Sequence, residues 1–244
     1  MMTTKKGTLL YEGKAKKIYK TDDPNILLVV YKDSATAFNG EKKAEIQGKG
    51  QLNNEISSLL FEKLNQHGIP NHFIKKVSPC EQLVKRVTII PLEVVVRNVV
   101  AGSLAKRLGI EEGTEIKKPV IEFYYKNDDL GDPLINNAHI ELLNLADQKQ
   151  LVEIERLALL VNDVLLKHFN ERNVRLIDFK LEFGVQEDGT VLVADEISPD
   201  TCRLWDKDTN QKLDKDVFRR DIGSLTEAYA EILKRLGGTV PCTK

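Results

Sequence analysis

Two acidic residues, Glu182 and Asp195, flank a segment that reads as a β-hairpin. If a two-residue turn at Asp188-Gly189 closes this hairpin symmetrically, Glu182 pairs with Asp195 across the ladder. Like charges that face each other destabilise a sheet unless a cation lies between them. Magnesium takes oxygen ligands and is typically held by one or two carboxylates plus substrate phosphates. The pair therefore predicts a magnesium site.

The alternative is a solvated sheet face that carries unrelated charges, and composition alone does not separate the two interpretations. Period-two alternation favours the site, because Asp178, Lys180 and Glu182 share one face of the predicted strand while its apolar residues share the other. The prediction depends on the register, since a bulged three-residue turn would shift the pairing.

A second candidate site is the segment Gly13-Lys14-Ala15-Lys16, which lies between two short strand-like runs. Backbone amides next to Gly13, with Lys14 or Lys16 nearby, could cover nucleotide phosphates as a lid. The segment is not a P-loop, because both the Gly-x-x-x-x-Gly-Lys-Ser/Thr pattern and the strand-to-helix context are missing. A basic turn on a solvated hairpin is the commoner meaning of such a segment and stays the alternative.

A third candidate is a phosphate cradle around Arg97, which ends a strand-like run. Ala101-Gly102-Ser103 follows, with Ser103 as the expected N-cap of a helix over residues 104–108. A guanidinium, a hydroxyl and helix N-terminal amides would then lie together. The alternative is an ordinary serine cap beside a surface arginine. Arg203, which follows the acidic hairpin, is the candidate for a second cation.

Composition gives no global sign of a polyanionic partner, because 36 lysines and arginines nearly balance 37 acids. We therefore expect neither nucleic acid nor membrane as a partner. The N-terminus has no signal-like apolar stretch, and no run approaches the ~18 to 20 apolar residues of a membrane span. Cys80, Cys202 and Cys242 lack Cys-x-x-Cys spacing, which argues against disulfides and a structural zinc site and fits a reducing cytoplasm.

The elements that must position these residues form an α+β pattern in two domains. The first part contains mostly short strands joined by tight turns, which predicts a small, mostly antiparallel β domain. Pro91 marks the predicted boundary, so the domains are residues 1–90 and 91–244. The remaining expectations are a mobile loop over residues 32–50, an irregular segment over 113–139, and helices over 51–66, 151–169 and 221–236, the second one preceded by an Asp147/Gln150 capping pair.

Four motifs, in order along nearly the whole chain, closely resemble the phosphoribosylaminoimidazole-succinocarboxamide synthase (SAICAR synthetase) family. They are residues 12–19, 94–103, 176–184 and 195–206. The resemblance implies an ATP-dependent ligase of purine biosynthesis, cytoplasmic and homodimeric. It would join L-aspartate to the carboxylate of CAIR, an imidazole ribonucleotide, and release ADP and phosphate through an acyl phosphate. The family fold implies a cleft between two domains, the smaller one resembling a protein-kinase N-lobe.

The resemblance also implies roles for single residues. It assigns Mg²⁺ to Glu182 and Asp195, and ATP to a set that lies mostly in the glycine-lysine segment: Gly13, Lys14, Ala15, Lys16 and Lys126. It assigns the ribonucleotide 5′-phosphate to Arg97, Ser103 and Arg203. The catalytic set around the imidazole carboxylate and amine is Asp178, Lys180 and Asp200. We expect Asp200 to contact the ribose or the amine and not to act as the general base.

The segment of residues 33–40 resembles the family's loop over the substrates, where a lid would keep water from a reactive acyl phosphate. Two rival functions come from other classes. A kinase-like phosphotransferase is disfavoured because Asp178-Phe-Lys is not Asp-Phe-Gly and no His-Arg-Asp segment is present. A regulatory nucleotide-binding module would have no use for the Arg97, Ser103 and Arg203 cradle.

Overall fold

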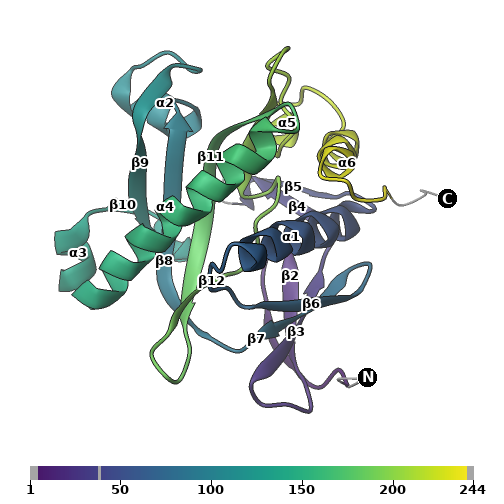
Figure 1. Cartoon of the computed structure of the whole chain (residues 1–244), viewed down its shortest axis with the longest axis vertical. Helices are drawn as coiled ribbons and strands as arrows, with labels where there is room; N and C mark the ends of the chain where they lie inside the picture. Colours follow the sequence, from purple (N-terminus) through teal and green to yellow (C-terminus); the bar gives the residue numbers. More distant parts are fainter. Residues whose placement is uncertain (1–4, 38–39, 241–244) are drawn as a thin grey trace.

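Strands dominate the first part of the computed structural model, which describes residues 5–37 and 40–240 (Figure 1). Residues 38–39 of the predicted lid, and Cys242, lie outside the described residues. A five-stranded antiparallel sheet has the order β1-β2-β3-β7-β6. Its strands are β1 (Leu9–Glu12), β2 (Lys16–Lys20), β3 (Ile26–Tyr31), β6 (Phe73–Ser78) and β7 (Glu81–Lys85). This confirms the antiparallel sheet that the short strand-like runs predict.

Helix α1 (Lys49–Gln66) covers this sheet and contacts β3, β6 and β7. Its apolar residues Ile56, Leu60 and Phe61 are fully buried. The helix also packs against α6 (Leu225–Arg235), near the other end of the chain. The predicted helices over 51–66 and 221–236 are therefore present, and their contact joins segments that lie far apart in the sequence.

A second, larger sheet of six strands carries most of the acidic residues of interest. Its order is β10-β9-β8-β11-β12, with β13 also paired to β11. The strands are β8 (Thr88–Val99), β9 (Glu115–Tyr125), β10 (Leu134–Ile135), β11 (Val174–Val185), β12 (Val191–Ala194) and β13 (Cys202–Asp206). The long strands β8 and β11 pair antiparallel through the centre of the molecule. Residues on one face of β11 therefore neighbour residues of β8, β12 and β13.

Helix α4 (Gln148–Asn170) packs against β8, β11 and β12 (Figure 1). Asp147 caps its start, accepting a hydrogen bond from the Gln150 backbone N–H at 2.8 Å, while the Gln150 side chain accepts one from the Asp147 N–H at 2.9 Å. This capping box confirms the sequence prediction. None of the helices in the part of the chain described here combines the length and apolarity that a membrane crossing requires.

Two segments predicted to be irregular contain regular structure. The predicted loop over 32–50 holds a small hairpin of β4 (Ser34–Ala37) and β5 (Lys42–Glu45), and helix α1 begins within it. The segment 113–139 holds β9 and β10, the 3-10 turn Asp128–Leu130 and the start of α3 (Asn137–Leu142). Pairing of β9 with β8 supplies backbone hydrogen bonds that local composition does not reveal. The other short helices are α2 (Gly102–Leu108) and α5 (Asp216–Arg219).

The passage from one sheet to the other lies between Lys85, the last residue of β7, and Thr88, the first of β8. Pro91 lies inside β8, where its carbonyl accepts a hydrogen bond from the Lys126 N–H at 3.0 Å. Proline cannot donate to a ladder, but it tolerates a strand position where its nitrogen is not needed. The division into domains of residues 1–90 and 91–244 stays a prediction, and one apolar core runs through residues of both parts.

His168, near the end of α4, predicts an acid-sensitive contribution to stability. The residue is buried, and its Nδ1 atom has no hydrogen-bond partner within the described ranges. Burial, reinforced by the charge of Arg172, lowers the pKa of His168 from 6.5 to about 4. The neutral ring is therefore favoured in the fold, and the stability that it gives is present above pH 6.5 and lost as the pH falls toward 4.

We expect the free energy of unfolding to fall by about 2 kcal/mol more in the wild type than in His168→Gln between pH 7 and pH 4.5. Urea unfolding at the two pH values measures this difference, because carboxylates that titrate in the same range contribute equally to both proteins. An equal loss in both proteins would mean that His168 takes up its proton freely in the fold.

Candidate active site

The β11–β12 hairpin does not have the predicted register. Glu182 pairs with Ala194, so the predicted pairing of Glu182 with Asp195 is wrong by one residue. The Gln186 N–H donates to the Thr190 carbonyl at 3.0 Å, which leaves a loop of three residues, 187–189, in place of the two-residue turn. Gly189 supplies the left-handed backbone (φ 85°) that a three-residue hairpin loop needs.

Asp195 nevertheless reaches the same cleft as Glu182. A regular strand would direct residues 194 and 195 to opposite faces of the sheet. Asp195 lies just past the end of β12 and has a left-handed backbone (φ 59°), which breaks this alternation. The two carboxylates thus line one site without being ladder partners.

The cleft has a volume of about 620 Å³ and is lined from both sheets. Every residue that the sequence assigns to a site lines it. These residues are Gly13, Lys14, Ala15, Lys16, Arg97, Ser103, Lys126, Asp178, Lys180, Glu182, Asp195, Asp200 and Arg203. Segments more than a hundred residues apart in the chain therefore meet at one place.

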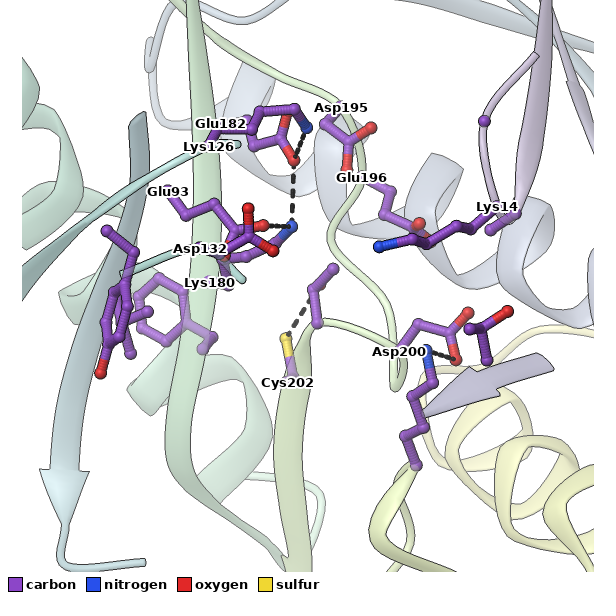
Figure 2. Close-up of a pocket in the computed structure, with 18 of the residues that line it drawn as sticks. Lys14, Glu93, Lys126, Asp132, Lys180, Glu182, Asp195, Glu196, Asp200 and Cys202 are labelled. Carbon is purple, nitrogen blue, oxygen red and sulfur yellow. Dashed lines mark hydrogen bonds and ion pairs between the residues drawn. The ribbon is translucent and has the colours of Figure 1, made fainter. Parts of the chain in front are cut away.

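Lysines and acids alternate along one wall of the cleft (Figure 2). Lys180 donates to Glu93 at 2.7 Å and to Glu182 at 3.0 Å, while Lys126 donates to Glu182 at 2.6 Å. Burial lowers the pKa of Lys180, but the carboxylates of Glu182 and Glu93 outweigh it and raise the pKa above its ordinary value. Lys180 is therefore a fixed positive charge between two acids.

The opposite wall has a second acid-lysine group. Lys16 forms ion pairs with Asp195 and with Glu196, the latter at 3.0 Å. Burial raises the pKa of Asp195, but Lys16 and Lys180 outweigh that effect and hold the pKa below its usual range. Glu196 is buried and accepts a hydrogen bond from the Ser198 hydroxyl at 2.7 Å. Lys16 and Asp195 therefore form a charged pair at neutral pH.

The glycine-lysine segment forms the turn between β1 and β2. The Gly13 N–H donates to the Lys16 carbonyl at 2.8 Å, and the Ala15 carbonyl accepts from the Lys32 N–H at 2.8 Å. Lys14 forms an ion pair with Asp128 at 2.8 Å, and both side chains are well exposed. Such exposed pairs contribute little to stability, so Lys14 can exchange its partner for a ligand at low cost.

Arg97 lies buried in a network of polar side chains at the α2 end of the cleft. Its guanidinium donates to Glu122 at 2.6 Å, to Asp178 at 2.8 Å, to the Tyr124 hydroxyl at 3.1 Å and to the Ser103 hydroxyl at 3.2 Å. The prediction that Arg97 and Ser103 lie together is confirmed. Protein groups occupy most of the donors of Arg97.

Ser103 is not an N-cap, because helix α2 begins at Gly102 and Ala101 holds the capping position. Gly102 has a left-handed backbone (φ 55°), and any side chain there would collide with the Arg203 guanidinium. Helix α2 therefore begins at Gly102, two residues before the predicted start at residue 104. Because Gly102 has no side chain, Arg203 can approach the first turn of the helix closely.

Arg203 shares the carboxylate of Asp178 with Arg97. Arg203 Nη1 lies 2.9 Å from Asp178 Oδ2, and its Nε donates to Asp216 at 3.1 Å. Asp178 is buried and bridges the two guanidinium groups. Asp178 therefore holds the side chains of Arg97 and Arg203 in place.

Asp200 lies at the back of the cleft, where its carboxylate is almost fully buried. It accepts hydrogen bonds from Lys49 at 2.5 Å, from the Tyr229 hydroxyl at 2.6 Å and from Asn53 at 2.8 Å. Burial raises the pKa of Asp200, but Lys215 and Lys49 outweigh burial and lower the pKa overall. The carboxylate ties α1, α6 and the loop before β13 together.

Sequence reasoning missed several of these groups, namely Glu93, Glu122, Glu196, Lys49, Tyr124, Lys215 and Arg219. Strand alternation is the one signal that could have pointed to Glu93, because it faces Glu182 across the β8–β11 pair. In the described part of the chain, no group of three or more histidine, cysteine or acidic side chains is arranged to hold a metal ion. A metal here would have to take further ligands from a substrate or water.

Comparisons with known proteins agree on one family. A model of the SAICAR synthetase family matches residues 9–236. The phosphoribosylaminoimidazole-succinocarboxamide synthase of Bacillus subtilis is 68% identical over 97% of this chain and 98% of its own. The synthase of the same name from Anoxybacillus flavithermus is 64% identical over 97% of this chain and 98% of its own.

Solved structures give the same result. The synthase of that name from Ehrlichia chaffeensis has a TM-score of 0.93 and 47% identity, covering 96% of this chain and 100% of its own. A SAICAR synthetase in complex with ADP also has a TM-score of 0.93, with 49% identity and coverage of 97% and 100%.

Proposed function

The chain belongs to the SAICAR synthetase family, and from that membership we propose how its cleft carries out the family's reaction. The enzyme is an ATP-dependent ligase of purine biosynthesis. It joins L-aspartate to the carboxylate of CAIR and forms SAICAR, ADP and phosphate. The observation that carries the proposal is that one cleft holds both an acid-lysine wall and an arginine network. The ADP complex of a relative supports ATP as the phosphoryl donor.

The chemistry explains why both kinds of charge are needed. An amine does not displace oxide from a carboxylate, so one carboxylate oxygen of CAIR must first take the γ-phosphoryl group of ATP. ADP leaves in that step, and the aspartate amine then attacks the acyl carbon and expels phosphate. Positioning and electrostatic stabilisation supply most of the catalysis in such phosphoryl transfers.

We assign the nucleotide to the wall that carries the β1–β2 turn. The turn at Gly13 presents backbone to the cleft, with Lys14, Ala15 and Lys16 directly after it. Lys126, about two-fifths exposed and directly after the end of β9, also lines the cleft. These lysines would neutralise the phosphates of ATP.

We propose that Glu182 and Asp195 would hold Mg²⁺. The donor set fits, because both are carboxylates that line one cleft, and the ammonium of Lys180 interacts electrostatically with both of them, as a cation between the two would. Mg²⁺ uses few protein carboxylates and keeps positions for phosphate oxygens and water. When bound, the ion would supply charge neutralisation at the triphosphate.

We assign CAIR to the arginine side of the cleft. Arg203 and Ser103 suit its 5′-phosphate, because a planar guanidinium matches phosphate oxygens. Arg97 has most of its donors satisfied by protein groups, so it holds Ser103 and Asp178 in place. Lys180 lies between the two groups of charges and would steady the carboxylate that is phosphorylated.

The β4–β5 hairpin would act as the lid over the substrates. Thr36, Ala37 and Gly40 line the cleft. Lys42, on β5, reaches across to the Phe218 carbonyl at 2.6 Å and to Asp221 at 2.5 Å. A hairpin held in this position over the cleft would exclude water and limit hydrolysis of the acyl phosphate.

The decisive assay measures ADP release by the purified protein with ATP, CAIR and L-aspartate, and then with each omitted in turn. We expect release to require all three. ADP release that is equal without aspartate would favour a kinase-like phosphotransferase, and no release at all would favour a nucleotide-binding module without chemistry. We further propose a cytoplasmic homodimer, as family membership implies.

A further inference from the structure

Asp216, the first residue of α5, lies behind the arginine side of the cleft. It is 1% exposed and does not line the cleft itself. Its Oδ2 accepts a hydrogen bond from Arg203 Nε at 3.1 Å, and its Oδ1 accepts one from Arg219 Nη1 at 2.6 Å. Arg203 and Arg219 both line the cleft. One buried carboxylate therefore uses its two oxygens on two cleft arginines.

The backbone holds Asp216 itself in place. Its N–H donates to Asp214 Oδ1 at 2.7 Å, and Asp214 Oδ2 accepts from the Leu204 N–H at 2.8 Å. Leu204 follows Arg203 directly on β13. Asp216 is thus linked through Asp214 to β13, the strand that carries Arg203. The side-chain hydrogen bond and this backbone link together fix the position of Asp216 relative to Arg203.

Each of the two cleft arginines keeps donors that no carboxylate holds. Asp178 and Asp216 occupy Arg203 Nη1 and Nε, and no hydrogen bond from its Nη2 to any residue in the described ranges is present. Arg219 uses Nη1 on Asp216, and its side chain is 30% exposed. Carboxylates therefore hold only part of each guanidinium, Asp178 and Asp216 on Arg203 and Asp216 on Arg219.

We propose that Asp216 is a positioning residue that sets the orientation of Arg203 and Arg219 toward the anionic end of CAIR. This inference rests on the proposed function. It adds Arg219 as a second guanidinium at that end and gives the pair a common support. Charge-assisted hydrogen bonds of this kind are short and directional, so loss of the support would let both side chains rotate away from the substrate.

A merely structural role makes a different prediction. Asp216 also lies 3.4 Å from Arg220, which pairs with Glu112 at the surface. If the carboxylate served only to anchor α5, its loss would lower stability and would affect all substrates alike. The two roles are separated by the Michaelis constants of the individual substrates.

The test is steady-state ADP release by Asp216→Asn. We expect the KM for CAIR to rise about tenfold or more, since hydrogen bonds to charged groups are worth that factor, while the KM for ATP stays within about twofold. Asp216→Glu keeps the charge and should recover part of the CAIR affinity. It also serves as the test variant if Asp216→Asn does not fold, since its KM for CAIR should still exceed that of the wild type.

Asp206→Asn is the matched control. Asp206 is buried on the same strand as Arg203, pairs with Arg235 at 2.8 Å and does not line the cleft. We expect it to lose stability with an unchanged KM for CAIR. An unchanged KM for CAIR in folded Asp216→Asn and Asp216→Glu, or an equal rise for ATP and CAIR, would overturn the inference.

Failure of the proposed function would look different, since the wild type would then release no ADP. Calorimetric binding of ribose 5-phosphate would still test Asp216 in that case. Weaker binding to Asp216→Asn than to the wild type supports the positioning role, and equal binding overturns it.

Discussion

Replacement of Glu182 by glutamine is expected to lower kcat by a factor on the order of 10² to 10³ and to leave the fold intact. Glutamine has the same shape and keeps an oxygen for Lys126 and Lys180, which donate to Glu182 Oε1 at 2.6 and 3.0 Å. It removes the negative charge that the proposed Mg²⁺ site requires. It also leaves the charge of Lys180 balanced mainly by Glu93.

The measurement is ADP release as a function of Mg²⁺ concentration, with thermal unfolding as the check on folding. Besides the lower kcat, we expect the Mg²⁺ concentration for half-maximal activity to rise. Glu187→Gln is the matched control, because Glu187 is exposed on the loop of the same hairpin. It should behave as the wild type. Near-normal turnover of Glu182→Gln at low Mg²⁺ would remove Glu182 from the metal site.

The motifs were sufficient to predict which residues share a site, but not how the hairpin places them. Asp188-Gly189 is a strong sequence signal for a two-residue turn. In the structure, Asp188 Oδ1 instead accepts the Thr190 N–H at 2.9 Å, and Gly189 takes the left-handed position of a three-residue loop. Both turns use the same two residues. The register is decided by the pairing of β11 with its neighbours, which the local sequence does not contain.

The partners of the site residues were beyond sequence reasoning for a different reason. Lys49 is 1% exposed, although lysine is almost never fully buried unless it is paired. Its partner Asp200 lies 151 residues away. Tyr124, in β9, likewise has a partner that the local sequence does not identify, because Arg97 lies 27 residues away. Only the pairing of distant strands and helices gives such residues a role.

The fold class could be predicted because it depends on local patterns. Short β-rich runs with tight turns predicted the antiparallel sheet, and the capping box with its apolar stripe predicted α4. The exact passage between sheets could not be predicted, because β8 continues through Pro91. A proline in a strand is a break only where its missing N–H is needed, and that depends on the neighbouring strand.

Asp200→Asn is expected to lower the free energy of unfolding by about 3 to 5 kcal/mol, because it leaves the buried ammonium of Lys49 without its counter-charge. Asparagine keeps one acceptor oxygen, but its amide nitrogen replaces the other, which is either Oδ1, the acceptor from Tyr229 at 2.6 Å, or Oδ2, the acceptor from Asn53 at 2.8 Å. Urea unfolding measures the loss, and an unchanged midpoint would show that the buried Lys49–Asp200 pair does not contribute to stability.

Variants of the Lys49–Asp200 ion pair distinguish a structural role of Asp200 from a catalytic role. Lys49→Met removes the buried charge together with the need for its partner, so Asp200→Asn should cost much less stability in that background. If Asp200 binds substrate and is not the general base, turnover of folded Asp200→Asn should stay within about tenfold of the wild type, since a lost general base costs about 10² to 10⁴-fold. A loss of that larger size, in a variant whose fold is intact, would assign Asp200 to proton transfer from the aspartate amine.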